Sequence, residues 1–280
     1  MKIFIHTNNK QGLGAILSKY SFEKNSSNSS VDTEFINVDN LEVFKKFVGK
    51  KYKRSGREVV YDPNDLQSFT LSRFMPPQIM GYEGKALVID PDVFAVTDVN
   101  DLLTIDLQGK AIAACRKKDA WDTSVMVLDC SKLKHWRIEN ILEDLMEKKL
   151  DYANLMTLKQ EDQSSILEIP RIWNSLDTLT PETKMIHMTN RLTQPWKTGL
   201  PIDFTIAPMP KFFGIIPREP VHKILGKYPT HYQKHPNEEI EKLFFGLVKD
   251  AVNSGSLTKN EIANQISLGY VREDLLEKVF

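Results

Sequence analysis

The sequence predicts an α/β protein in which helices cover both faces of a sheet. Short apolar runs rich in β-branched side chains alternate, over the first 150 residues, with segments whose apolar residues recur at helical spacing. The 280-residue chain is long enough for one large α/β domain or for two smaller ones. Its hydrophobic content of 41% and charged content of 26% are typical of globular proteins.

The predicted elements follow one another along the first half of the chain. Strands are expected at residues 3–6, 33–38, 86–89, 111–115 and 124–128. Helices are expected at residues 12–20, 41–48, 65–76 and 138–149, the third of them ended by Pro76-Pro77. The Ser/Asn-rich residues 24–30 and the basic residues 50–57 are expected to be loops.

The last third of the chain has a different character. Eight prolines in residues 193–236 exclude long helices and predict an irregular segment that wraps over the domain. An amphipathic helix is expected at 238–254, and Thr258 with Glu261 fits the capping box of a further helix. We therefore expect a catalytic domain in residues 1–200 and, in residues 201–280, a proline-rich wrap with a helical extension packed on it.

The composition also limits the partners and the compartment. The 37 basic and 37 acidic residues cancel, so the charge gives no indication of nucleic acid as a partner. Cys115 and Cys130 form no C-x-x-C motif, and free thiols in a reducing compartment are expected. No signal-like segment or apolar run of roughly 18 residues is present, so we expect a cytoplasmic protein without a transmembrane segment.

Two carboxylates end the apolar run at residues 86–89. Pro91 separates Asp90 from Asp92, and it ends the strand because proline donates no ladder hydrogen bond. Two like charges at a strand end repel each other, and a divalent cation such as Mg²⁺ or Mn²⁺ would relieve that repulsion. A solvated turn that caps a helix is the alternative interpretation, and the three residues alone favour it.

Other polar residues extend this pattern along the chain. Seven stretches stand in a fixed order: Ser72-Arg73-Phe74, Asp90-Pro91-Asp92, Asp122-Thr123-Ser124-Val125-Met126, Asp162-Gln163, Trp173-Asn174, His187 and Gln194-Pro195-Trp196. In this order they resemble the retaining GT-A-type glycosyltransferases of the glycogenin and bacterial lipopolysaccharide galactosyltransferase family, family 8. The resemblance covers roughly the first 200 residues and implies a Rossmann-like mixed sheet that binds a nucleotide-diphosphate sugar.

The resemblance implies roles for residues that would hold the donor. Asp90, Asp92 and His187 would bind Mn²⁺ or Mg²⁺, because two carboxylates and an imidazole suit these cations. Arg73 would hold the nucleotide or the donor sugar. Thr7 and Asn8, at the carboxyl end of the first strand, would contact the base and the ribose. An ordinary strand–helix turn explains Thr7 and Asn8 equally well.

Three further residues would act at the reacting carbon. A neutral amide is a poor nucleophile, so Gln163, beside Asp162, would stabilise an oxocarbenium-like centre, and the anomeric configuration would be retained. The alternative for this pair is a helix N-terminus with acids in its first turn. Asp122 stands where the family usually has Asn, and Gln194 stands where it has Lys. Lys197 is close enough in sequence to replace that lysine in a phosphate contact.

These residues predict a metal-dependent transfer of a sugar from a nucleotide-diphosphate donor, UDP by resemblance, to an unknown acceptor. Two alternatives remain at this stage. The first is a catalytically altered nucleotide-sugar-binding protein on the same fold. The second is a Mg²⁺-dependent phosphatase or phosphotransferase with Asp90 as the nucleophile, although Phe94 stands where that class has Thr or Val.

Overall fold

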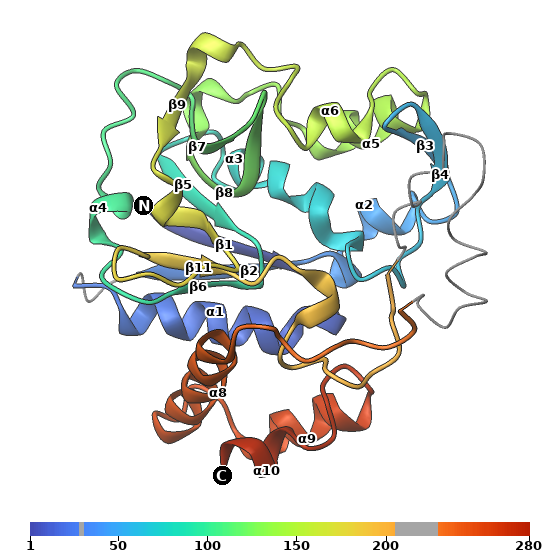
Figure 1. The fold of residues 1–280 in the computed structure, drawn as a ribbon. Helices are drawn as coiled ribbons and strands as arrows, with labels where there is room; N and C mark the ends of the chain where they lie inside the picture. Colours follow the sequence, from blue (N-terminus) through green and yellow to red (C-terminus); the bar gives the residue numbers. More distant parts are fainter. Residues whose placement is uncertain (28–30, 205–228) are drawn as a thin grey trace, which may run out of the picture.

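The computed structural model describes residues 1–27, 31–204 and 229–280, and it confirms the α/β fold class with a mixed central sheet. The sheet has the strand order β2 (Asp32–Asn37), β1 (Lys2–Thr7), β5 (Lys85–Ile89), β8 (Ala120–Asp129), β7 (Ile112–Lys117) and β9 (Ile166–Ile169). Strand β1 is parallel to β2 and β5, whereas β8 is antiparallel to both of its neighbours. Figure 1 shows this sheet across the middle of the molecule.

Two smaller sheets lie beside it. One has the order β10 (Ser175–Leu176), β11 (Met185–His187) and β6 (Val93–Ala95), and the other is the hairpin β3 (Lys51–Arg54) and β4 (Arg57–Val60). The described α-helices are α1 (Gly12–Lys24), α2 (Glu42–Lys45), α3 (Pro76–Ile79), α4 (Asn100–Leu103), α5 (Ile138–Met146), α6 (Tyr152–Leu155), α8 (Glu238–Asn253), α9 (Lys259–Ser267) and α10 (Leu275–Val279).

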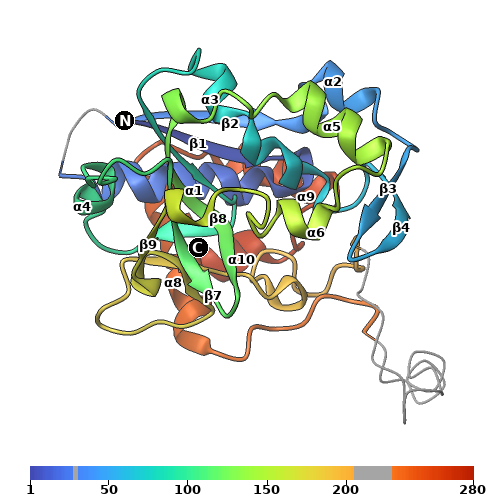
Figure 2. The same ribbon diagram turned by 90° about the horizontal axis from the view of Figure 1, so that it is seen from above.

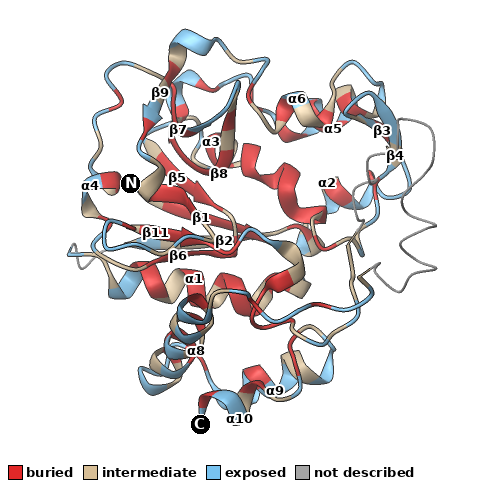
Figure 3. Cartoon of the chain, in the orientation of Figure 1, coloured by how far each residue is buried: buried red, intermediate tan, exposed pale blue. Residues whose placement is uncertain are grey.

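Side chains alternate between the two faces of the central sheet, as the period of a strand requires. Phe4 and Val88 belong to the core shared with α2 and α5, and Ile3 and Leu87 belong to the core shared with α1 and α4. The strands therefore read as nearly continuous apolar runs, because both faces are covered. Figure 3 shows this buried centre, with exposed residues on the outer surfaces of the helices.

Helix α1 is buried on two sides. Ala15 and Phe22 contact the sheet, while Leu13 and Leu17 join Phe244 of α8 in a third core. Helices α8 to α10 lie on the side of α1 that faces away from the sheet (Figure 1). The expected apolar stripe of the 238–254 segment is thus buried against the main body of the chain. The domain limits at residues 1–200 and 201–280 stay a prediction, and residues 205–228 of the proline-rich segment lie outside the described residues.

Two predicted segments are corrected by the structure. Residues 50–57 are not a loop but most of the β3–β4 hairpin, whose turn residues Ser55 and Gly56 have φ of 53° and 73°, as a two-residue hairpin turn requires. Residues 65–76 are not an α-helix but the 3₁₀ segment η3 (Ser68–Phe74) followed by the short α3. In this segment Thr70 donates to Gln67 O, a local side-chain bond that competes with helix formation.

Candidate functional site

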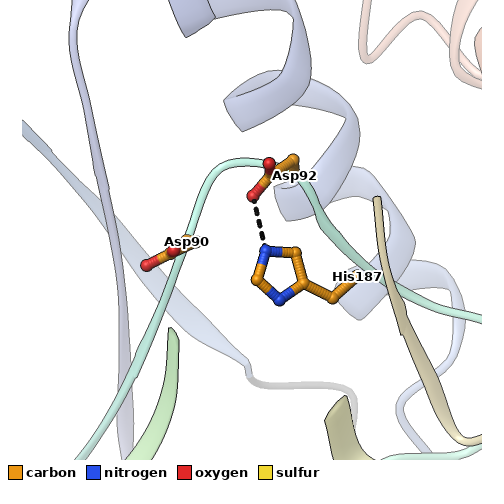
Figure 4. Close-up of side chains that lie close together, drawn as sticks. All are labelled: Asp90, Asp92 and His187. Carbon is orange, nitrogen blue, oxygen red and sulfur yellow. Dashed lines mark ion pairs between the residues drawn. The ribbon is translucent and has the colours of Figure 1, made fainter. Parts of the chain in front are cut away.

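The candidate site is a cavity of about 280 Å³ at the carboxyl end of β5. Asp90 follows β5 directly, and Asp92 precedes β6. Strand β11 pairs with β6 so that His187 lies opposite Val93, and Met188 N donates to Asp92 O at 3.0 Å. This pairing carries His187, almost a hundred residues further along the chain, to the Asp90–Asp92 turn (Figure 4).

The three side chains form a compact group of potential metal ligands. One ligand atom from each of Asp90, Asp92 and His187 lies within 4.8 Å of the others. Nε2 of His187 is 3.3 Å from Oδ1 of Asp92, as the dashed line in Figure 4 marks. Nδ1 of His187 is 2.9 Å from Oδ1 of Asn174 and donates to it, which leaves Nε2 directed at the carboxylates. Metal-ligating histidines are commonly oriented by such a bond.

Asp90 is held by two basic side chains. Nε2 of His6 donates to Oδ1 of Asp90 at 2.6 Å, and Nη2 of Arg73 donates to the same oxygen at 2.9 Å. Arg73 also donates to Thr123 Oγ1, so that η3 is tied to β8 across the cavity. The side chains of Arg73 and Asp90 are only 7% and 13% exposed, so this ion pair is largely removed from solvent. His6 is fully buried, and burial lowers the pKa of its imidazole.

A second polar chain runs from His187 to Asp122. Nδ2 of Asn174 donates to Ser124 Oγ at 3.0 Å, and Ser124 Oγ donates to Asp122 Oδ1 at 2.5 Å. The other carboxylate oxygen of Asp122 accepts from Nη1 of Arg171 at 2.9 Å. Asn174 therefore orients His187 directly and Asp122 through Ser124, which gives a structural reason for the Trp173-Asn174 stretch.

The pKa values follow from these contacts. Burial would raise the pKa of Asp90, but Arg73 and His6 outweigh it and lower the pKa to about 2. Burial would lower the pKa of His187, but the carboxylates of Asp92, Asp90 and Asp122 outweigh it and raise the pKa to about 9. Burial likewise opposes ionisation of Asp122, yet Ser124, His187 and Arg171 lower its pKa. Asp90 and Asp122 are thus ionised at neutral pH.

The donor set fits a divalent cation. Two carboxylates with one imidazole nitrogen suit Mn²⁺ or Mg²⁺. Gln194 adds an amide beside them, since its Nε2 donates to Asp92 Oδ2 at 3.1 Å. The buried Oε1 of Gln194 has no hydrogen-bond partner among the residues that the structure describes. An unsatisfied oxygen therefore lies next to the three potential ligands, where a cation or its water would satisfy it.

The family of the chain is shown by its sequence. The family model for glycosyl transferase family 8 matches residues 5–191, about two thirds of the chain. The chain belongs to glycosyltransferase family 8. Its fold is the GT-A fold, as the resemblance in the sequence predicts. A search of curated proteins finds no match.

Solved structures agree with this glycosyltransferase fold. An active-site mutant of LgtC is similar with a TM-score of 0.52 and 12% identity, over 70% of this chain and 89% of that chain. The galactosyltransferase LgtC in complex with donor and acceptor sugar analogues gives 0.50 and 13% over the same shares. The glycosyltransferase GlyE of Streptococcus pneumoniae TIGR4 gives 0.50 and 16%, over 70% of this chain and 56% of that chain.

The catalytic pair predicted in this family 8 chain does not line the cavity. Asp162 caps the 3₁₀ segment η5 (Gln163–Ser165) by accepting from Ser164 N at 2.9 Å. The Gln163 side chain accepts from Trp121 Nε1 at 2.8 Å and donates to Leu158 O and Glu161 O, both at 2.8 Å. Gln163 thus supports Trp121, which does line the cavity. The catalytic role of Asp162 and Gln163 stays a prediction, and neither side chain contacts the cavity in this structure.

Two predicted donor-binding residues also form other contacts. Asn8 caps η1 (Asn9–Gln11), and its amide donates to Leu66 O and Ser68 Oγ at 3.1 and 2.9 Å. Thr7 donates to Asn8 O at 3.1 Å. Neither residue lines the cavity, so their contacts with base and ribose stay predictions.

Lys197 is buried outside the cavity wall. Its side chain is 1% exposed and lies 3.4 Å from Asp203 Oδ2. Burial lowers the pKa of Lys197, against the influence of Asp203. The position of the family's lysine is instead filled by Gln194, which does line the cavity and contacts Asp92. A phosphate contact of Lys197 stays a prediction.

The sequence interpretation missed His6 and two arginines, Arg54 and Arg191. His6 ends in the site because β1 and β5 are parallel neighbours, and Phe4, two residues earlier, is the register partner of Val88. A histidine near the carboxyl end of the first strand was the available signal. Arg54 and Arg191 line the cavity from the β3–β4 hairpin and from η7 (Arg191–Thr193). No signal marked Arg54, because its segment was interpreted as a loop.

Proposed function

We propose that the chain is a metal-dependent glycosyltransferase that transfers a sugar from a UDP-linked donor to an acceptor with retention of the anomeric configuration. The observation that carries the proposal is the Asp90–Asp92–His187 group within a polar cavity of a family 8 chain. A divalent cation bound there, Mn²⁺ or Mg²⁺, would neutralise charge that develops on the diphosphate leaving group.

The residues of the chain keep this site ready for such a ligand. His6 and Arg73 hold Asp90 ionised and fixed, and Asn174 fixes the ring of His187. This rigidity limits the reorganisation that binding requires. The diphosphate leaving group would take the proton of the acceptor hydroxyl on the face it leaves, so that no strong protein base is required and the configuration is retained.

Asp122 is the residue that would serve an inverting reaction instead. Its carboxylate lines the cavity and is ionised, as a general base must be. Both of its oxygens, however, already accept hydrogen bonds from Ser124 and Arg171. We therefore propose that Asp122 positions groups rather than takes the acceptor proton.

Incubation with an α-linked UDP-sugar and Mn²⁺ tests the proposal. Release of UDP, with water or a glycan as acceptor, is expected only when the cation is present. Proton NMR of the first product is expected to show the α-anomer. A β-linked product would overturn retention and make Asp122 the leading candidate for the base, and absence of both UDP binding and UDP release would overturn the proposal.

One observation favours a second candidate, a nucleotide-sugar-binding protein without transferase activity. The side chains of Asp162 and Gln163 do not line the cavity, and both atoms of the Gln163 amide group are already bonded. Metal-dependent binding of UDP-sugar without turnover would support this candidate. The fold and family lend no support to a phosphotransferase with Asp90 as nucleophile, whose Oδ1 already accepts from His6 and Arg73.

The partners and compartment follow as parts of the proposal. The donor is a nucleotide-diphosphate sugar, the acceptor is a glycan, lipid or protein, and nucleic acid is not a partner. None of the described helices combines the length and apolar character that crossing a membrane requires. We propose a cytoplasmic location, which suits Cys115 and Cys130, because both thiols are free and buried.

A further inference from the structure

Three cations at the wall of the cavity have no carboxylate partner. Arg54, Lys117 and Arg191 all line it, and among residues 1–27, 31–204 and 229–280 none of them is within 4.0 Å of a carboxylate oxygen. Unpaired arginines on a concave, partly desolvated surface attract anions strongly. We propose that Arg54 and Arg191 bind an anionic group, a phosphate or a carboxylate, on the acceptor.

The charge balance of the cavity separates these cations from the donor site. The cavity has three carboxylates: Asp90 and Asp122 are paired with Arg73 and Arg171, whereas Asp92 lies beside His187, whose ring is neutral when it binds a metal. A divalent cation adds two positive charges, and a nucleotide-diphosphate sugar brings about two negative ones at neutral pH. The charges of the donor and its metal therefore cancel. The three unpaired cations outnumber the one carboxylate left without a charged partner, so an excess of positive charge remains for another ligand.

Arg54 is held in place by the hairpin that carries it. Asp151 accepts from the backbone amides of Ser55 and Gly56 at 3.0 and 2.7 Å, which anchors the turn next to Arg54 to the start of α6. The guanidinium of Arg54 lies 4.8 Å from the ring centre of Tyr152. Figures 1 and 2 both show the hairpin beside α5 and α6. The hairpin thus presents Arg54 to the cavity without an internal ion pair.

Arg191, which begins η7 far from Arg54 in the sequence, is also held in place by its neighbours. Its Nη1 donates to Gln67 Oε1 at 2.9 Å, and its guanidinium lies 4.6 Å from the ring centre of Phe204. Burial lowers the pKa of Arg191, and the charge of Arg54 lowers it further. Two guanidiniums that repel each other in a half-buried wall are stabilised when an anion binds between them.

The guanidinium groups of Arg54 and Arg191 are suited to bind a phosphate or a carboxylate rather than a neutral hydroxyl. Both anions accept paired N–H bonds from guanidinium, and stacked guanidiniums lose little freedom on binding. Lys117 adds a flexible charge at the same wall. The inference rests on the proposed function, because it assigns the anion to the acceptor and the metal site to the donor.

The test compares neutral and anionic forms of the same sugars. Glucose, galactose and N-acetylglucosamine, their 6-phosphates and the matching uronic acids are titrated into the protein saturated with UDP and Mn²⁺. At least one anionic form is expected to bind about tenfold more tightly than its neutral parent, as paired charge-assisted bonds allow. Arg54→Gln and Arg191→Gln should each remove most of that preference, while UDP affinity stays within about twofold of wild type.

Arg57→Gln is the matched control. Arg57 is the register partner of Arg54 on the other strand of the hairpin, is exposed and does not line the cavity. It should keep the preference for the anionic sugar, which separates a local contact from a general effect of net charge. Equal preference for neutral and anionic forms in wild type would overturn the inference.

The outcomes also separate this inference from the proposed function. Arg54→Gln and Arg191→Gln variants that weaken UDP by tenfold or more would assign the arginines to the donor diphosphate and overturn the acceptor assignment. If wild type binds no UDP but binds a sugar phosphate through Arg54 and Arg191, the proposed function fails and the anion site stands.

Discussion

The cavity has two contrasting parts, which we call the inner end (Asp90, Asp92 and Asp122) and the arginine-lined wall (Arg54 and Arg191), and their charges are balanced in opposite ways. At the inner end Asp90, Asp92 and Asp122 are each paired with a basic side chain, and all of these side chains except that of Arg171 are largely buried. At the wall Arg54 and Arg191 are half-buried and lie against aromatic rings, with no carboxylate within ion-pair distance in the part of the chain that the structure describes. The difference teaches that the charges of the inner end are balanced before any ligand binds, whereas those of the arginine-lined wall are balanced only by a bound anion.

The largest expected effect on stability comes from the inner end. Arg73→Met leaves the buried Asp90 with His6 as its remaining basic contact, and it should lower the free energy of unfolding by about 3 kcal/mol, since an uncompensated buried charge is costly. The measurement is urea unfolding monitored by circular dichroism.

Arg171→Met is the matched comparison, because Arg171 pairs with Asp122 but its side chain is 36% exposed, against 7% for Arg73. A loss of about 1 kcal/mol or less is expected for this variant. Equal losses for Arg73→Met and Arg171→Met would contradict the view that the Asp90 pair is the more buried and the more important.

A smaller effect is expected where α1 approaches the Asp90–Asp92 turn. A Cβ atom on Gly14 would lie 2.8 Å from the backbone oxygen of Pro91, and backbone cannot move aside as a flexible side chain does. Gly14→Ala should therefore destabilise the protein by about 1–3 kcal/mol and weaken Mn²⁺ binding, because it displaces the two aspartates.

Gly246→Ala is the control for that substitution. Gly246 lies in α8, and a Cβ there would meet nothing within 4 Å. Alanine should stabilise the helix by roughly 0.5–1 kcal/mol without a change in Mn²⁺ affinity. A Gly14→Ala variant that behaves like Gly246→Ala would show that the close approach of α1 does not fix the turn.

The smallest expected effect is the pH dependence of stability that arises from His187 at the inner end. The pKa of His187 is raised from 6.5 to about 9 in the folded protein, so its ion pairs stabilise the metal-free protein fully below pH 6.5 and are lost as the pH rises through about 9. Stability without metal should fall over that interval, and His187→Asn should remove this part of the decline.

Metal affinity should change in the opposite direction. The imidazolium must lose its proton before Nε2 can bind a cation, so Mn²⁺ affinity should rise by up to about tenfold per pH unit between pH 6.5 and 8.5. Calorimetry in buffers of different ionisation enthalpy should detect about one proton released. A pH-independent affinity with no proton release would show that His187 is not a ligand.

Much of the fold, and the grouping of Asp90, Asp92 and His187, could be predicted from the sequence. Apolar runs such as residues 86–89 mark buried strands, and the carboxylates of Asp90 and Asp92 stand out because a strand end is a costly place for two like charges. His187 was predicted through its place in a family order, but its contact with Asp92 depends on the β6–β11 pairing, which no local pattern reveals.

Other parts of the site depend on contacts that the sequence order conceals. Gln163 was expected at the reacting carbon, yet a bond from Trp121 holds it outside the cavity wall. Arg54 was placed in a loop, because residues 50–57 are basic and contain Gly56. The hairpin that they form is anchored at its turn by Asp151, about a hundred residues away, and no local pattern reveals that contact. Side chains at a cavity wall are positioned by such long-range bonds, whereas periodicity reports only local structure.

The most direct test of the central claim is calorimetric titration of UDP into the protein with and without Mn²⁺, for wild type, Asp92→Asn and Asp101→Asn. Asp101 is an exposed aspartate on α4 and controls for the loss of one charge. Wild type and Asp101→Asn should bind UDP at least about tenfold more tightly with Mn²⁺, and Asp92→Asn should lose this gain. Unchanged Mn²⁺-dependent binding in Asp92→Asn would contradict the account.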